Sequence, residues 1–60
     1  MRIETIIANG YKFVVGARTP IGSGVVNNIL KENDNHYIVI LSEKQEIDVI
    51  SDNVIVLINI

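Results

Sequence analysis

Cysteine and tryptophan are absent from this sequence, and histidine occurs only once, as His36. Without cysteine the chain forms no disulfide, and one imidazole without a thiolate is too little for a zinc site. A single domain of 60 residues buries only a small core. We therefore expect no bound metal or cofactor, and stability that comes from tight β packing or from association with other chains.

Long apolar runs are also lacking. The longest run, from Val54 to Ile58, is far shorter than the roughly 20 residues that a membrane-spanning helix needs. The start of the chain does not show the charged region, apolar segment and small-residue cleavage site of a secretory signal. These absences predict a cytoplasmic protein that does not enter a membrane.

Basic residues are few, and they are scattered along the chain. Lysine and arginine together number 5 against 7 aspartates and glutamates, which gives a net charge of −2. The basic residues are Arg2, Lys12, Arg18, Lys31 and Lys44. Because binding to phosphates generally needs a basic face, this balance argues against a nucleic-acid partner.

The residues that are abundant, isoleucine and valine, favour β-strands because their branched side chains suit a pleated surface. Asn9-Gly10 is typical of a two-residue hairpin turn, and Asn27-Asn28 interrupts an alternating pattern as a β-bulge would. The spacing predicts strands over residues 2–7, 11–16, 25–30, 36–41, 45–50 and 54–60. For the first segment a short helix is the alternative, although a helix of this length would be marginal in water.

So many short strands in one small chain predict a partly open barrel. The glycines and strands of the first half follow a pattern of three segments, Gly10-Tyr11-Lys12-Phe13-Val14, Arg18-Thr19-Pro20 and Gly22-Ser23-Gly24-Val25-Val26. The pattern resembles the opening of small SH3-like barrels of the Tudor and KOW kind, and the resemblance covers residues 10–60. It implies an all-β fold, a small SH3-like barrel of five or six strands, to which residues 1–8 would add an N-terminal strand.

The resemblance also implies binding sites. KOW modules commonly bind RNA or proteins that handle nucleic acids, which makes loop residues candidate contacts, namely Arg18, Thr19, Ile21 and Lys31. Tudor modules often hold methylated side chains in a cage of several aromatic rings. Here Tyr11 and Phe13 share one strand face and are expected to fill the core, so we do not expect an aromatic cage.

Patterns that support catalysis are missing. Ser23 lies between two glycines but lacks the five-residue nucleophile elbow, and no Gly-Lys-Ser/Thr step follows it to hold a phosphate. Glu46 and Asp48 alternate with apolar residues, which is typical of the exposed face of a strand. His36 is expected as an exposed histidine at a strand edge. We therefore expect neither enzyme activity nor a small-molecule substrate.

Two of the predicted strands, residues 36–41 and 54–60, are apolar on both faces. A small barrel has one interior and encloses only one face of each strand, and contiguous exposed apolar area usually marks an interface. The candidate interface residues are Ile38, Ile40, Ile55 and Leu57. In the alternative, the isoleucines of residues 1–8 cover the surplus apolar surface within one chain.

These inferences point to a non-enzymatic interaction module. We expect a protein-binding regulator or inhibitor, self-associated as a homo-oligomer or bound to a protein partner, of the kind that phages and mobile elements encode. The alternative function is that of a nucleic-acid-binding accessory protein of the KOW type.

Overall fold

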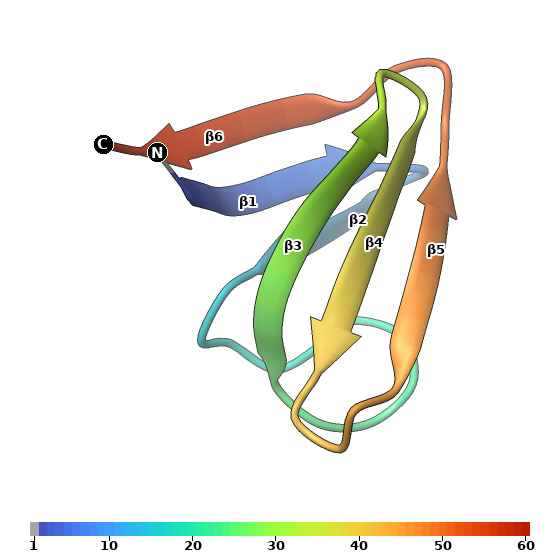
Figure 1. Ribbon diagram of the computed structural model, residues 1–60. Helices are drawn as coiled ribbons and strands as arrows, with labels where there is room; N and C mark the ends of the chain where they lie inside the picture. Colours follow the sequence, from blue (N-terminus) through green and yellow to red (C-terminus); the bar gives the residue numbers. More distant parts are fainter. Residues whose placement is uncertain (1) are drawn as a thin grey trace.

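The computed structural model describes residues 2–60, which form six strands and no helix (Figure 1). The strands are β1 (Arg2–Ala8), β2 (Tyr11–Val14), β3 (Val26–Asn33), β4 (His36–Leu41), β5 (Glu46–Ile50) and β6 (Ile55–Asn59). The predicted all-β class is confirmed. The first segment is a strand, so the helix considered for it is wrong.

The strands form two antiparallel sheets with the orders β2-β1-β6 and β3-β4-β5. Figure 1 shows β6 and β1 on one side of the molecule and β3, β4 and β5 on the other. Over residues 2–60 the sheets are not closed into a barrel. The chain between β2 and β3 links them, because Arg18 forms a bridge with Val25 and the Val26 N–H donates to the Ala17 carbonyl at 2.9 Å.

The turn and the bulge predicted from the sequence are both present. Asn9 and Gly10 have φ angles of 54° and 82°, the left-handed values that a tight hairpin turn between β1 and β2 requires. The register of β3 against β4 shifts between Val26 and Asn28, where the alternation of the sequence is interrupted. Local sequence chemistry therefore sets both features.

Two strand ends differ from the prediction by more than one residue, because pairing decides them. β3 continues to Asn33, past the predicted end at residue 30, because Lys31 is still paired with Tyr37 of β4. β2 ends at Val14, before the predicted residue 16, because the chain turns and the Ala17 N–H donates to the Val14 carbonyl at 3.0 Å.

The two sheets share one hydrophobic core. The first sheet contributes Ile6, Ala8 and Phe13, and the second contributes Val26, Ile29, Tyr37, Val39, Leu41 and Val49. β1, the strand expected as an addition to the barrel, lies in the middle of its sheet between β2 and β6. Burial of Ile6 and Ala8 makes β1 an integral part of the core.

Candidate protein-interaction surfaces

The outward face of the second sheet carries an apolar strip along its central strand. Side chains of β4 alternate, so that Tyr37, Val39 and Leu41 are buried while Ile38 and Ile40 point outward and are half-buried. On the neighbouring strand, Leu30 lies directly opposite Ile38 and is exposed. Ile38 and Ile40 therefore lie on the outward face of this sheet, and their role in an interface stays a prediction.

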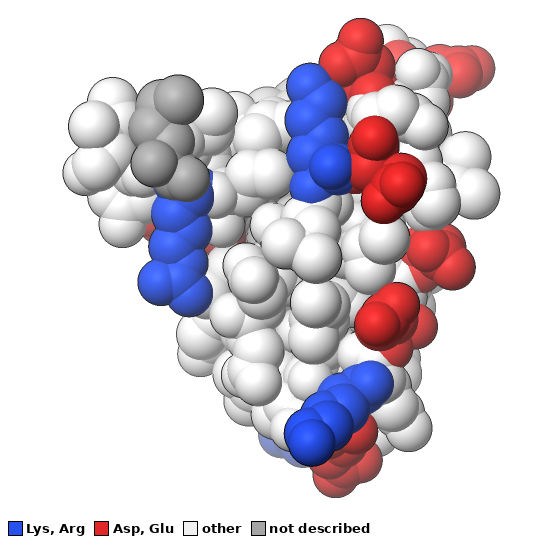
Figure 2. Space-filling view, in the orientation of Figure 1, with Lys and Arg blue, Asp and Glu red and all other residues white. Residues whose placement is uncertain are grey.

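Acidic side chains border this strip on one side. Asp48 and Glu46 of β5 lie opposite Ile38 and Ile40, and both are exposed. Figure 2 shows acidic side chains following this side of the molecule, over β5 and the β3–β4 hairpin, while the basic side chains in view stand apart from one another. The strip is thus an apolar surface with an acidic border.

The β3–β4 hairpin carries one ion pair. Lys31 Nζ lies 2.9 Å from Asp34 Oδ1 at the surface. The hydrogen bond from Lys31, followed by the attraction of its charge, lowers the pKa of Asp34, and the same contact raises the pKa of Lys31. Lys31 therefore stays charged, but the adjacent Asp34 carboxylate balances its charge, which weakens its candidacy for phosphate binding.

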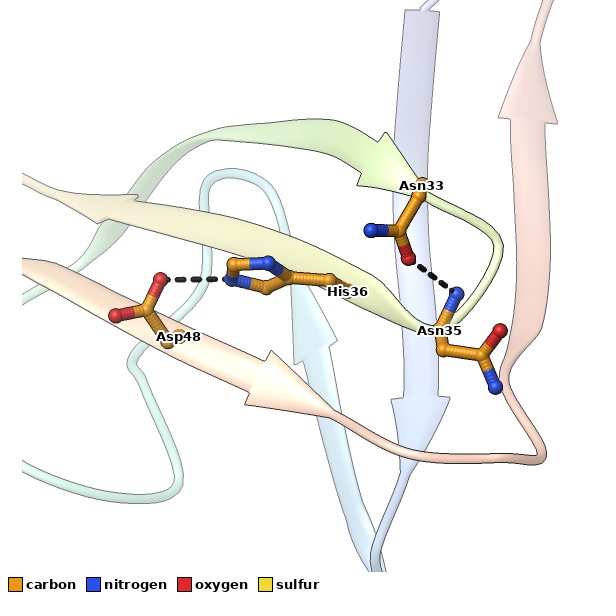
Figure 3. A network of polar contacts seen from close by, with 4 residues as sticks. All are labelled: Asn33, Asn35, His36 and Asp48. Carbon is orange, nitrogen blue, oxygen red and sulfur yellow. Dashed lines mark hydrogen bonds and ion pairs between the residues drawn. The ribbon is translucent and has the colours of Figure 1, made fainter.

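His36 and Asp48 form a second polar contact on the same outward face (Figure 3). His36 Nε2 lies 2.9 Å from Asp48 Oδ1, across the pairing of β4 with β5. Next to it, the Asn35 N–H donates to Asn33 Oδ1 at 2.9 Å and holds the turn of the hairpin. The His36–Asp48 contact joins β4 to β5. The hydroxyl of Ser51, the residue after β5, is hydrogen-bonded to the backbone of Asn53. His36 begins β4, the middle strand of its sheet, so the arrangement is that of a cross-strand link from β4 to the edge strand β5.

β6 exposes apolar side chains on both of its faces. Ile55 and Leu57 point to the outward face of the first sheet and are 58% and 50% exposed. On the other face Val56 packs against the core, but Ile58, one pair nearer the end of the strand, is 50% exposed. In Figure 1 this end of β6 extends away from the second sheet, in keeping with the exposure of half of Ile58.

The structure separates the four predicted interface residues into two pairs. Ile38 and Ile40 lie on the outward face of one sheet, and Ile55 and Leu57 lie on the outward face of the other. The alternative, in which residues 1–8 cover the surplus apolar surface, is not what β1 does. β1 lies beside β6 in the same sheet, where it pairs with β6 and leaves Ile55 and Leu57 exposed.

Sequence reasoning missed two apolar residues of the β3–β4–β5 face. Leu30 and Ile50 are both exposed there, the first opposite Ile38 and the second opposite His36. The alternating pattern could place each on one side of its own strand. Only the register between strands, which the sequence pattern does not contain, shows that they extend the same strip.

The predicted loop contacts do not form one site. Arg18 is exposed, whereas Thr19 is buried and its hydroxyl donates to the Ile21 carbonyl at 2.7 Å. Ile21 packs against the core. Arg18 forms a bridge with Val25, the residue before β3, and Lys31 lies six residues further along the chain, at most about 20 Å away at roughly 3.3 Å per residue. The two cations therefore lie toward opposite ends of β3 and do not form one basic cluster.

One small cavity lies at the surface of the described part of the chain. A cavity of about 210 Å³ lies between Arg2, Glu4, Val15 and Asn59, below the roughly 300–1,000 Å³ of ordinary ligand pockets. Residues 2–60 contain no group of three or more His, Asp or Glu side chains that could hold a metal ion. No helix capable of crossing a membrane occurs among them.

Comparisons of the chain with protein-family models, with curated proteins and with solved structures gave no match. The exposed apolar faces and the distribution of charge are therefore the observations from which a function has to be argued. The resemblance to Tudor and KOW barrels stays a prediction from the sequence.

Proposed function

We propose that this chain is a small non-enzymatic protein-binding module, which acts as a regulator or inhibitor by covering the surface of a protein partner or of another copy of itself. The observation that carries the proposal is the exposure of neighbouring apolar side chains on the outward faces of both sheets. These side chains are the exposed Leu30 and Ile50 with the half-buried Ile38 and Ile40 on one face, and the exposed Ile55 and Leu57 on the other.

The physical argument is that such exposure works against a protein that stays alone. A chain this small has little core to spare, and each apolar side chain left in water forgoes part of the roughly 1.5–3 kcal/mol that full burial contributes. An apolar area bordered by polar and charged residues is the usual composition of a protein interface. The strip on β4 with Glu46 and Asp48 beside it has this composition.

Nucleic-acid binding of the KOW type, the alternative from the sequence, has less support. The net charge is −2, Arg18 and Lys31 lie toward opposite ends of β3, and Lys31 is paired with Asp34. Binding to phosphates depends on several cations acting together. The distribution of charge therefore favours a protein partner.

The proposal is tested by affinity capture from the native host with matched baits. The wild-type chain is compared with Ile38→Thr/Ile40→Thr and with Ile55→Thr/Leu57→Thr, changes that keep branched or β-compatible side chains while removing apolar area. Ile60→Thr is the control, because Ile60 is fully exposed and lies beyond the end of β6. Circular dichroism establishes that each bait is folded.

We expect the wild type and the control to capture one protein in stoichiometric amount, or to self-associate, and one double variant to lose that binding. If all four baits behave alike, the apolar faces are not interaction surfaces. Recovery of nucleic acid that is lost as salt rises would replace the proposal with the KOW-type alternative.

A further inference from the structure

The two sheets have four edge strands, and three of the edges are protected against pairing with another chain. β5 carries Glu46 and Asp48, and charged residues discourage pairing at an edge. β3 is paired at its start, where the Gly16 N–H donates to the Val26 carbonyl at 2.8 Å, and it carries charged residues near its end. β2 has only 4 residues, one of them Lys12.

β6 is the edge that lacks these protections. Its five residues, Ile55–Asn59, include no charged residue and no proline, and within residues 2–60 only β1 pairs with it. An apolar edge strand with unpaired N–H and C=O groups is a template for another strand. Figure 1 shows β6 at the margin of the molecule, with β1 running along one side of it and no strand running along the other.

The pairing of β1 shows which residues of β6 direct their polar groups to the open side. The two-residue turn makes Ala8 and Tyr11 the hydrogen-bonded pair that closes the hairpin. The backbone N–H and C=O groups of every second residue of β1, counted back from Ala8, therefore point toward β2. The intervening residues, Ile7 and Thr5, direct their backbone groups toward β6, where they are paired with Ile55 and Leu57. By the same alternation the backbone groups of the intervening residues of β6, at positions 56 and 58, point outward.

We propose that β6 pairs in antiparallel fashion with β6 of a second copy of this chain, around a two-fold axis at Leu57. The proposal rests on the proposed function and specifies its partner and its surface. In this register the outward backbone groups of Val56 meet those of Ile58 in the other copy, and Leu57 lies beside its own counterpart. The β2-β1-β6 sheets of the two copies then form one continuous six-stranded sheet.

A second copy suits this edge because the strand is complementary to itself. The alternation leaves Leu57 in the more closely spaced, non-hydrogen-bonded kind of pair, where apolar side chains cover each other. Charge does not oppose the approach. The charged residues in the strands of this sheet are Arg2, Lys12 and Glu4, which together give +1. The remaining residues carry −3, so that the whole chain has a net charge of −2.

Charge-swapped variants at Leu57 test the arrangement. Leu57 is half-exposed, so Leu57→Lys and Leu57→Glu leave the core intact, but each places two like charges directly opposite one another at the axis. We expect the wild type to sediment as a dimer at micromolar concentration and each variant to dimerise on the order of 100-fold more weakly, because like charges at an interface cost several kcal/mol. An equimolar mixture of the two variants should recover a heterodimer.

A proline substitution in the edge strand supplies a second test that does not depend on the Leu57 side chain. Ile58→Pro removes an outward N–H while β1 keeps its partners, since proline is tolerated on edge strands where the N–H faces outward. Ile58→Thr is the matched control, which shortens the same exposed side chain but keeps the N–H. Dimerisation should be lost with proline and kept with threonine.

Three results would overturn the pairing: a wild type that stays monomeric at high concentration, charge variants that dimerise as the wild type does, or a mixture that fails to form heterodimers. A monomeric wild type that still captures a host protein would refute self-pairing and leave the protein-binding function standing. A dimer that persists in Ile58→Pro but dissociates in Ile38→Thr/Ile40→Thr would move the interface to the other sheet.

Discussion

Ile6 offers the sharpest test of the shared core, because a single methyl group can be removed from its centre. Ile6 is 0% exposed, lies on the middle strand of its sheet and is paired with Phe13 and Val56. Ile6→Val deletes one methyl group, worth about 0.8 kcal/mol of burial, and the small cavity left behind brings the expected loss to about 0.5–1.5 kcal/mol.

That loss is measurable because the variant keeps enough stability to remain folded in the absence of urea. At about 0.05–0.15 kcal/mol per residue, a chain of 60 residues has a free energy of unfolding of roughly 3–9 kcal/mol. In urea, with a slope near 1 kcal/mol per molar for so small a protein, Ile6→Val should lower the unfolding midpoint by about 0.5–1.5 M. The assay is urea denaturation followed by circular dichroism at one fixed protein concentration.

The matched control is Ile50→Val, the same chemical change at a side chain that is 66% exposed on the outward face of the other sheet. It should shift the midpoint by less than the error of the measurement, because most of the deleted group is already in water. Equal shifts for the two variants would refute the burial of Ile6 between the sheets, and with it the shared core.

Three further predictions concern the turn, the ion pair and nucleic acid. Gly10→Ala should destabilise the chain by about 1 kcal/mol, because Gly10 has φ of 82° while an added Cβ would meet no atom within 4 Å; an unchanged thermal midpoint would contradict the turn. The lowered pKa of Asp34 means that its contribution to stability is present above its unfolded value, near 3.8, and is lost as pH falls through the folded value; the raised pKa of Lys31 acts oppositely, so its contribution is present below about 10.5 and is lost as pH rises through the folded value. The free energy of unfolding of Asp34→Asn, measured against pH, should therefore lack both the acidic and the alkaline loss. A variant with the pH profile of the wild type would show that other groups cause these losses. A salt titration should find no binding of generic oligonucleotides near physiological salt, and micromolar binding that is lost in Arg18→Glu would reverse this prediction.

Much of the fold could be read from local patterns, and the reasons are local too. Alternation of isoleucine and valine with polar residues identifies strands, and Asn9-Gly10 supplies the positive φ angles that a two-residue turn needs. The interruption at Asn27-Asn28 marks the bulge because an extra residue breaks the two-residue period. In each case the determining interactions lie within a few residues of each other.

The candidate surfaces could be predicted only in part. Alternation correctly placed Ile38 and Ile40 on one side of their strand and Ile55 and Leu57 on one side of theirs. It could not show that the two pairs lie on different sheets, because that depends on which strands become neighbours. It also left open that the isoleucines of residues 1–8 cover the surplus apolar surface within one chain, whereas β1 lies beside β6 in the same sheet.

The strands, their turns and the alternation of each are local properties, since they follow from side-chain branching, backbone freedom and hydrogen-bonding capacity at neighbouring positions. Tertiary structure decided the rest. Pairing between β1 and β6, which joins the two ends of the chain, places an uncharged strand at a sheet edge and surrounds Ile6 with the core. Which residues of β1 and β6 pair depends on the joint burial of the nine core side chains among residues 2–60. That burial is a property of the whole fold, which no local pattern contains.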